Sequence, residues 1–125
     1  MTWSGFAFET LCLKHIRQIV KGLGISGMLV NSYSWRNSNA QIDLLIDRSD
    51  RCINLCEIKF SEAEFVVSKA YFENLQRKKA EFKKEMKVRK NVFVTFLTTF
   101  GVKENDNYVK IIDNQLSIGS LFCID

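Results

Sequence analysis

Two neighbouring segments with strand-like patterns, residues 40–47 and 52–60, constrain the fold of this chain more than any other feature. The first alternates apolar and polar side chains, and the second is mostly apolar. Only four residues, 48–51, connect them, and all four are polar, so the two segments are predicted to form a β-hairpin. Helix-like patterns lie on both sides of this hairpin. The chain is therefore expected to be an α/β protein with a mixed central sheet and helices packed on it.

The whole chain predicts the element order α-β-β-β-α-β-β. Ser4 is the expected N-cap of the first helix, and Gly22 or Gly24 would end it. Ser61 and Glu64 have the spacing of a capping box, which predicts a short helical turn there. Besides the hairpin, the predicted elements are helices over 6–23 and 68–86, strands over 28–35, 91–100 and 108–112, a turn over 37–39 and a closing segment over 116–122.

Length and composition indicate one domain that spans residues 1–125. Hydrophobic residues make up 46% of the chain and charged residues 26%, which is typical of a globular protein. No apolar run approaches the ~20 residues that a membrane span requires. Residues 1–8 lack the basic start and apolar centre of a secretion signal. We therefore expect a cytoplasmic protein with no membrane partner.

The cysteines indicate neither a zinc site nor a disulfide. The four cysteines, Cys12, Cys52, Cys56 and Cys123, contain no CxxC pair, and His15 is the only histidine. Residues four apart in a strand are ~13 Å apart, so Cys52 and Cys56 cannot bridge each other. We expect buried free thiols, and we expect His15 on the exposed face of the first helix.

Large apolar and aromatic side chains are expected in the core. The second helix should bury a stripe at spacings of three, four and seven, formed by Tyr71, Phe72, Leu75, Phe82 and Met86. Core positions are also expected for Phe6, Phe8, Phe93, Phe96 and Phe100. Tyr33 and Trp35 share one face of the first strand, where core packing is the expectation and stacking on nucleic-acid bases is the alternative.

Glu9 is a charged residue in an apolar setting. On a helical wheel of ~100° per residue it lies in the middle of the stripe that should face the core. The stripe consists of Cys12, Leu13, Ile16, Val20 and Leu23. A buried carboxylate without a partner is costly. We therefore expect a cation, a hydrogen-bond donor or a metal ion beside Glu9.

Three further charged residues lie on the predicted hairpin. Strict alternation places Asp43 on the face opposite to Ile42 and Leu44, and it places Glu57 and Lys59 together on one face of the next strand. Asp43 and Glu57 would then lie on adjacent strands and the same face. A first helix covering that face would bring Glu9 to them.

Three carboxylates and a lysine at one place can perform phosphodiester chemistry. Carboxylate oxygens are the ligands that Mg²⁺ and Mn²⁺ prefer. A bound metal ion neutralises a phosphate and lowers the pKa of a water molecule, and a lysine can stabilise developing negative charge. Glu9, Asp43 and Glu57 are the candidate metal ligands, and Lys59 is the candidate catalytic lysine. A structural network of cross-strand ion pairs is the alternative.

These residues resemble the active-site motif of the PD-(D/E)XK nuclease superfamily. Asp43 stands in the segment Gln-Ile-Asp-Leu-Leu-Ile, and Glu57-Ile-Lys59 follows thirteen residues after it. Ile42 takes the place of the motif's proline. The resemblance implies a restriction-endonuclease-like core, with a helical glutamate matched by Glu9, and a metal-dependent nuclease that acts on DNA. RNA is an alternative substrate, and a homodimer is an open alternative to a monomer.

More narrowly, residues 5–9, 41–48 and 53–61 are similar to the nuclease-like domain at the C-terminus of certain prokaryotic AAA-type ATPases. This similarity implies that the chain is a fragment whose ATPase domain would precede it. The chain itself has no Walker A motif. The resemblance also implies a second functional hypothesis, namely a catalytically silent DNA-binding or regulatory domain of such an ATPase.

Positive charge is concentrated on the second predicted helix. Residues 68–90 carry nine basic and three acidic side chains, which amounts to +6, whereas the whole chain carries +4. An exposed basic helix face is either merely solvated or a track for phosphates. The candidate contacts to nucleic acid are Lys69, Gln76, Arg77 and Lys78.

Overall fold

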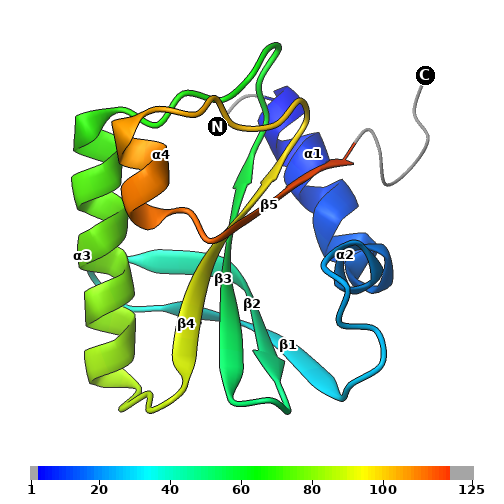
Figure 1. Ribbon diagram of the computed structural model, residues 1–125, viewed down its shortest axis with the longest axis vertical. Helices are drawn as coiled ribbons and strands as arrows, with labels where there is room; N and C mark the ends of the chain where they lie inside the picture. Colours follow the sequence, from blue (N-terminus) through cyan, green and yellow to red (C-terminus); the bar gives the residue numbers. More distant parts are fainter. Residues whose placement is uncertain (1–2, 119–125) are drawn as a thin grey trace.

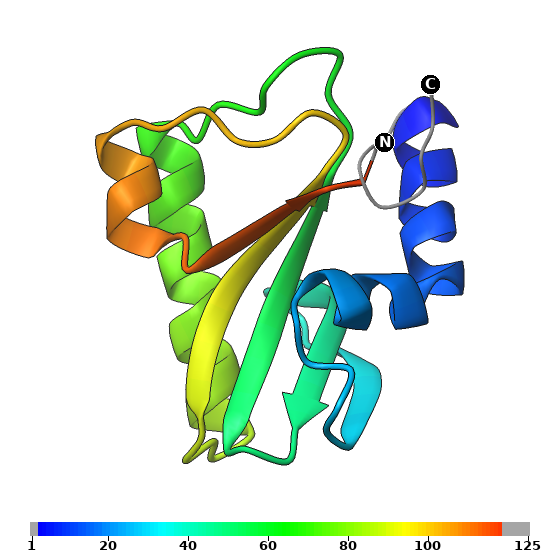
Figure 2. The same cartoon turned by 45° about the vertical axis from the view of Figure 1, so that its right-hand side comes forward.

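The computed structural model describes residues 3–118 as a mixed α/β fold, with a five-stranded sheet between two layers of helices (Figures 1 and 2). α1 and α2 cover one face of the sheet, and α3 and α4 lie on the other. The elements are α1 Trp3–Lys14, α2 Ile16–Gly22, β1 Val30–Arg36, β2 Gln41–Arg48, β3 Cys52–Lys59, α3 Lys69–Glu85, β4 Asn91–Thr98, α4 Asp106–Ile111 and β5 Asn114–Ser117.

The sheet is mixed, as its sequence pattern predicts. Its strands follow the order β1-β2-β3-β4-β5. β1, β2 and β3 are antiparallel neighbours, whereas β4 pairs parallel to β3, and β5 pairs parallel to β4. The parallel pairs require crossover connections, which α3 and α4 supply.

Each face of the sheet carries its own apolar core. On one face Leu55 and Phe96 pack with Leu75 and Phe82 of α3. On the other face the core is formed with α1 and α2, and its buried members include Phe8, Cys12, Ile19, Leu44 and Cys56. The sheet is thus buried on both sides, which explains why β3 reads as a nearly continuous apolar run.

The prediction for α3 is confirmed almost to the residue. Ser68 caps the helix, since its hydroxyl accepts a hydrogen bond from the backbone N–H of Tyr71 at 3.1 Å. Leu75 and Phe82 are buried, as the apolar stripe predicts. Met86 follows the last helical turn and is half exposed, so its place in the stripe was wrong.

The first predicted helix is in fact two helices. α1 already includes Ser4, so the predicted N-cap was wrong, and the helix breaks at His15. There the imidazole Nδ1 lies 2.8 Å from the carbonyl oxygen of Leu11, a group at the C-terminal end of α1. His15 is therefore half-buried at the junction and does not lie on an open helix face. The end of α2 agrees with the prediction, since Gly24 follows it with φ of +76°.

The predictions for two short segments were also wrong. Residues 108–112 were expected as a strand, but they fall largely in α4, because the Asn105 side chain caps that helix by accepting from the N–H of Tyr108 at 2.8 Å. Residues 61–64 form no helical turn. Ser61 is held by Thr99 instead, whose hydroxyl accepts from the Ser61 N–H at 3.0 Å.

The aromatic and cysteine predictions hold in part. Phe8, Phe96 and Trp35 are buried, and Trp35 packs edge-on against Phe82 with a centroid separation of 5.5 Å. Phe6 and Phe100 are 55% and 61% exposed, so their expected core positions were wrong. Cys12 and Cys56 are buried free thiols, and Cys52 is a half-buried one. Cys123 and most of the closing segment over 116–122 lie outside the described residues.

Candidate functional site

The four candidate residues converge on one end of the sheet. Asp43 is near the start of β2, and Glu57 and Lys59 are at the end of β3. The two strands are antiparallel, and Leu44 pairs with Cys56. One step further along the same register, Asp43 reaches Glu57. The hairpin predicted from the sequence thus brings these residues to adjacent positions.

A β-bulge changes the direction of Asp43. The register between β1 and β2 shifts between Tyr33 and Trp35, where one residue of β1, Ser34, stands opposite two of β2, Asp43 and Leu44. Ile42 consequently packs in the core next to α3, whereas Leu44 packs in the core next to α1. Strict alternation along β2 was therefore a wrong prediction. An extra residue in one strand removes the alternation locally, because two successive side chains share one side.

The bulge brings Asp43 to Glu9. The carboxyl groups of these two residues interact directly, and this interaction favours the protonated form of Glu9. Burial, and secondly the negative charge of Asp43, raise the pKa of Glu9, and the positive charge of Lys59 opposes this increase. The Nε2 group of Gln41 also donates to Asp43, at 2.5 Å. Two carboxyl groups in contact are a place where a divalent cation could bind in place of a proton.

Glu57 has different partners, and all of them come from α3. Tyr71 donates its hydroxyl to one carboxylate oxygen at 2.5 Å, and the Lys78 ammonium is 3.0 Å from the other. Glu57 is only 6% exposed. Burial and the nearby Glu57 charge raise the pKa of Tyr71, so the phenol stays a proton donor. These two contacts compensate the burial of the carboxylate.

Lys59 lies beside the ring of Tyr71 and close enough to Glu9 to act on it through its charge. Its ammonium is 5.0 Å from the centre of the Tyr71 ring, within the range of a cation–π contact. Its charge also acts on Glu9. Lys59 thus contacts the ring of Tyr71, whose hydroxyl binds Glu57, and its charge acts on Glu9, which interacts with Asp43.

The expected three-carboxylate cluster is only partly assembled. Glu9 and Asp43 are together, and their oxygens suit a hard divalent cation. Glu57 is adjacent in the sheet, but both of its oxygens are engaged by α3. Within residues 3–118, no group of three or more His, Cys, Asp or Glu side chains has the arrangement of a metal site. Glu9 and Asp43 therefore fit Mg²⁺ or Mn²⁺ as they stand, and Glu57 fits if it exchanges its partners.

Sequence reasoning missed Tyr71 and Gln41 as members of this site. Tyr71 was assigned to the apolar stripe of α3, and its ring does pack there, but its hydroxyl reaches Glu57. The signal was present, because a tyrosine at the edge of a buried stripe needs a partner for its hydroxyl. Gln41 gives no comparable signal, because its contact to Asp43 depends on the bulge.

Among the predicted nucleic-acid contacts, Lys78 belongs to the site itself. Arg77 and Lys78 line a small polar groove of about 270 Å³ together with Gln41, beside Asp43. Lys69 is exposed at the start of α3. Gln76 lies on the other flank of the helix, away from this groove.

Comparisons with known protein families and with curated proteins give no match for this chain. Within residues 3–118, every helix is too short or too polar to cross a membrane.

Proposed function

We propose that this chain is a metal-dependent nuclease domain with a restriction-endonuclease-like core that hydrolyses phosphodiester bonds in DNA. The observation that carries the proposal is the Glu9–Asp43 carboxyl pair at the end of β3 that bears Glu57 and Lys59. A structural ion-pair network would pair each acid with a base. Here two acids contact each other, an arrangement that is costly unless a cation is available to them.

The order of the elements supports the same class. After the two N-terminal helices, three antiparallel strands lead into α3, which crosses to the parallel strand β4. This is the α-β-β-β-α-β arrangement that the sequence motif implies. β5 extends the sheet beyond β4, and α4 precedes it.

The site residues would divide the work as follows. Glu9, Asp43 and Glu57 would hold Mg²⁺ or Mn²⁺, which when bound would neutralise a phosphate and lower the pKa of a water molecule. Lys59 would stabilise negative charge that develops on the phosphoryl oxygens. Lys78 would hold the Glu57 carboxylate in place.

One observation favours a second candidate function, a catalytically silent nucleic-acid-binding or regulatory domain of an AAA-type ATPase. Both oxygens of Glu57 are already engaged, by Tyr71 and Lys78. If Lys78 permanently occupies the place of a metal ion, the fold would bind nucleic acid without cutting it.

Incubation with labelled nucleic acid separates these functions. The substrates are single-stranded, duplex and branched DNA and a matched RNA, each with Mg²⁺, with Mn²⁺ and with EDTA. We expect cleavage of DNA with either metal and none with EDTA. Retention of DNA in a gel shift without cleavage under any condition would favour the silent domain. If the chain neither cleaves nor binds nucleic acid, both candidate functions are contradicted.

The metal itself is tested by calorimetric titration of Mn²⁺. Asp43→Asn should weaken binding, because an amide is a poorer ligand than a carboxylate. Asp106→Asn is the matched control, since Asp106 is an exposed residue in the first turn of α4. Equal affinity of wild type and Asp43→Asn would show that Asp43 is not a ligand.

A further inference from the structure

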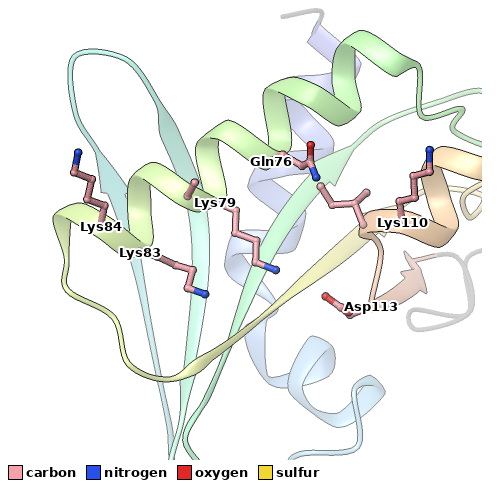
Figure 3. A pocket seen from close by; sticks show the side chains of 8 residues that line it. Gln76, Lys79, Lys83, Lys84, Lys110 and Asp113 are labelled. Atoms are coloured by element: carbon pink, nitrogen blue, oxygen red, sulfur yellow. The ribbon is translucent and has the colours of Figure 1, made fainter.

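A basic groove with a volume of about 740 Å³ lies between α3 and α4, on the flank of α3 that faces away from the candidate site (Figure 3). The side chains of Lys79 and Lys83 extend from α3 toward the same side, in the direction of Asp113. Lys110 enters from α4, opposite Gln76. Four lysines from two helices, Lys79, Lys83, Lys84 and Lys110, thus line the groove together with a single acid, Asp113.

The lysines that α3 contributes to this groove are not engaged in ion pairs within residues 3–118. Among residues 3–118, neither Lys79 nor Lys83 forms an ion pair. Glu81 and Glu85, acids on the same helix, are turned to its other flank. There they accept hydrogen bonds from Asn37 at 2.7 and 2.9 Å. Neither Glu81 nor Glu85 lines the α3–α4 groove, and the groove keeps a positive potential.

The acid at the edge of the groove has a structural role. One oxygen of Asp113 accepts the backbone N–H of Val94 at 2.8 Å, which ties the start of β5 to β4. Within residues 3–118 Asp113 forms no ion pair with a lysine, and the groove keeps a net positive charge. Lys110 lies over the ring of Phe72 with its ammonium 5.9 Å from the ring centre, so it too is without a carboxylate partner within the described chain.

Two basic residues, Lys84 and Arg77, connect this groove with the candidate site. Lys84 lines both the α3–α4 groove and the neighbouring depression on the outer side of α3. Arg77 lines that depression and also the small polar groove that holds Lys78 and Gln41. A chain of phosphates could thus pass from Asp43 along Arg77 and Lys84 into the α3–α4 groove, beside Glu81 and Glu85, which also line the depression.

We propose that the α3–α4 groove binds the sugar-phosphate backbone of the nucleic acid that enters the candidate site. Lys79 and Lys83 are one turn apart, with a rise of ~6 Å between them, so they can meet successive anionic groups of a chain. The groove is open, and Ala80 and Ile111 are its only apolar lining residues. It therefore suits a solvated polyanion better than a small ligand, which requires an enclosed apolar pocket. Contacts to the backbone make the binding independent of base sequence.

Fluorescence anisotropy with labelled duplex and single-stranded DNA in EDTA tests this inference without cleavage. The variant is Lys79→Gln combined with Lys83→Gln. We expect roughly 60-fold weaker binding to duplex at about 0.1 M salt, because each phosphate contact scales affinity with the salt concentration to the power of about −0.9. The salt slope should fall by about 1.8 on duplex and by about 1.4 on a single strand.

Two further variants separate the groove from net charge. Lys14→Gln combined with Lys21→Gln removes the same charge from exposed positions of α1 and α2, and it should change the affinity and the slope little. Asp113→Asn keeps the acceptor for Val94 but removes a negative charge, so it should strengthen binding. An equal loss in the control pair would overturn the inference, because net charge alone would then explain binding.

The inference rests on the proposed function, and the outcomes distinguish the two. If the wild type binds or cleaves DNA and the Lys79/Lys83 variant retains its affinity and salt slope, the groove is not part of the nucleic-acid path, and the nuclease proposal stands. If the wild type binds no DNA, both proposals fail. Binding of polyglutamate as tight as that of DNA, and lost in the same variant, would overturn the inference in favour of an acidic peptide.

Discussion

At the scale of single residues, the contact between Glu9 and Asp43 opposes folding at neutral pH. Burial and the charge of Asp43 raise the pKa of Glu9 above its ordinary value of 4.5. The folded chain therefore binds this proton more tightly than the unfolded chain does. This contribution to stability is fully present below 4.5 and is lost as the pH rises through the raised pKa. Such a pair is expected where function, and not stability, determines the residues.

Asp43→Asn should therefore raise the melting temperature of the metal-free protein at pH 7, because it removes one of two negative charges that repel each other. Glu9→Gln should do the same, and both should flatten the dependence of stability on pH above 4.5. Thermal melts across this pH range check the prediction, with the exposed residue Glu64→Gln as control. A lower melting temperature for Asp43→Asn would show that the carboxylate has a stabilising partner in the protein.

Tyr71 should matter for stability through its hydroxyl group. Tyr71→Phe removes a hydrogen bond to a buried carboxylate and leaves the ring packing intact, so it should lower the free energy of unfolding by roughly 1.5–3 kcal/mol. Urea denaturation measures this change. Tyr33→Phe is the control, since Tyr33 is half-buried in the same core and no hydrogen bond of its hydroxyl is found within residues 3–118. Equal changes in the two variants would contradict the role given to the Tyr71–Glu57 contact.

At the scale of elements, predictability followed the completeness of the local signal. α3 combines a serine cap with a stripe of apolar residues, and both signals agree with the structure. The region 108–112 has a β-branched, strand-like composition, but the cap at Asn105 lies upstream of it and makes it helical. The bulge in β2 depends on pairing with β1, so no pattern within β2 alone could reveal it. Sequence reasoning therefore placed Asp43 near Glu9 correctly but wrongly expected Glu57 to face the first helix, whereas Glu57 contacts Tyr71 and Lys78 of α3.

The cap of α3 is expected to support the site as well as the helix. Ser68→Ala should lower the free energy of unfolding by roughly 0.5–2 kcal/mol, because the Tyr71 N–H loses its acceptor. Denaturant titration checks this, with exposed Ser26→Ala as the control. An unchanged midpoint for Ser68→Ala would mean that water replaces the cap without loss.

At the scale of the whole molecule, charge and fold divide into two regions. Residues 68–90 carry +6, and the remainder of the chain carries −2. The acids of the candidate site lie on α1, β2 and β3, whereas its basic groups are Lys59 at the end of β3 and Arg77 and Lys78 of α3. The sheet joins these regions at one end, where Glu57 meets Lys78 at 3.0 Å. A polyanion and a divalent cation would complement this division together.

The measurement that tests the nuclease proposal most directly is the rate of DNA cleavage by Lys59→Ala in Mg²⁺ and in Mn²⁺, with Mn²⁺ affinity measured on the same samples. Lys59 contacts the site through charge and through the Tyr71 ring, and no carboxylate depends on it for an ion pair within residues 3–118.

We expect the fold and the metal affinity of Lys59→Ala to match the wild type, while cleavage falls by at least about 100-fold, as on removal of a group that stabilises transition-state charge. Lys103→Ala, an exposed lysine beyond β4, is the control and should cleave normally. Cleavage by Lys59→Ala at the wild-type rate would contradict the assignment of Lys59 and, with it, the proposed active site.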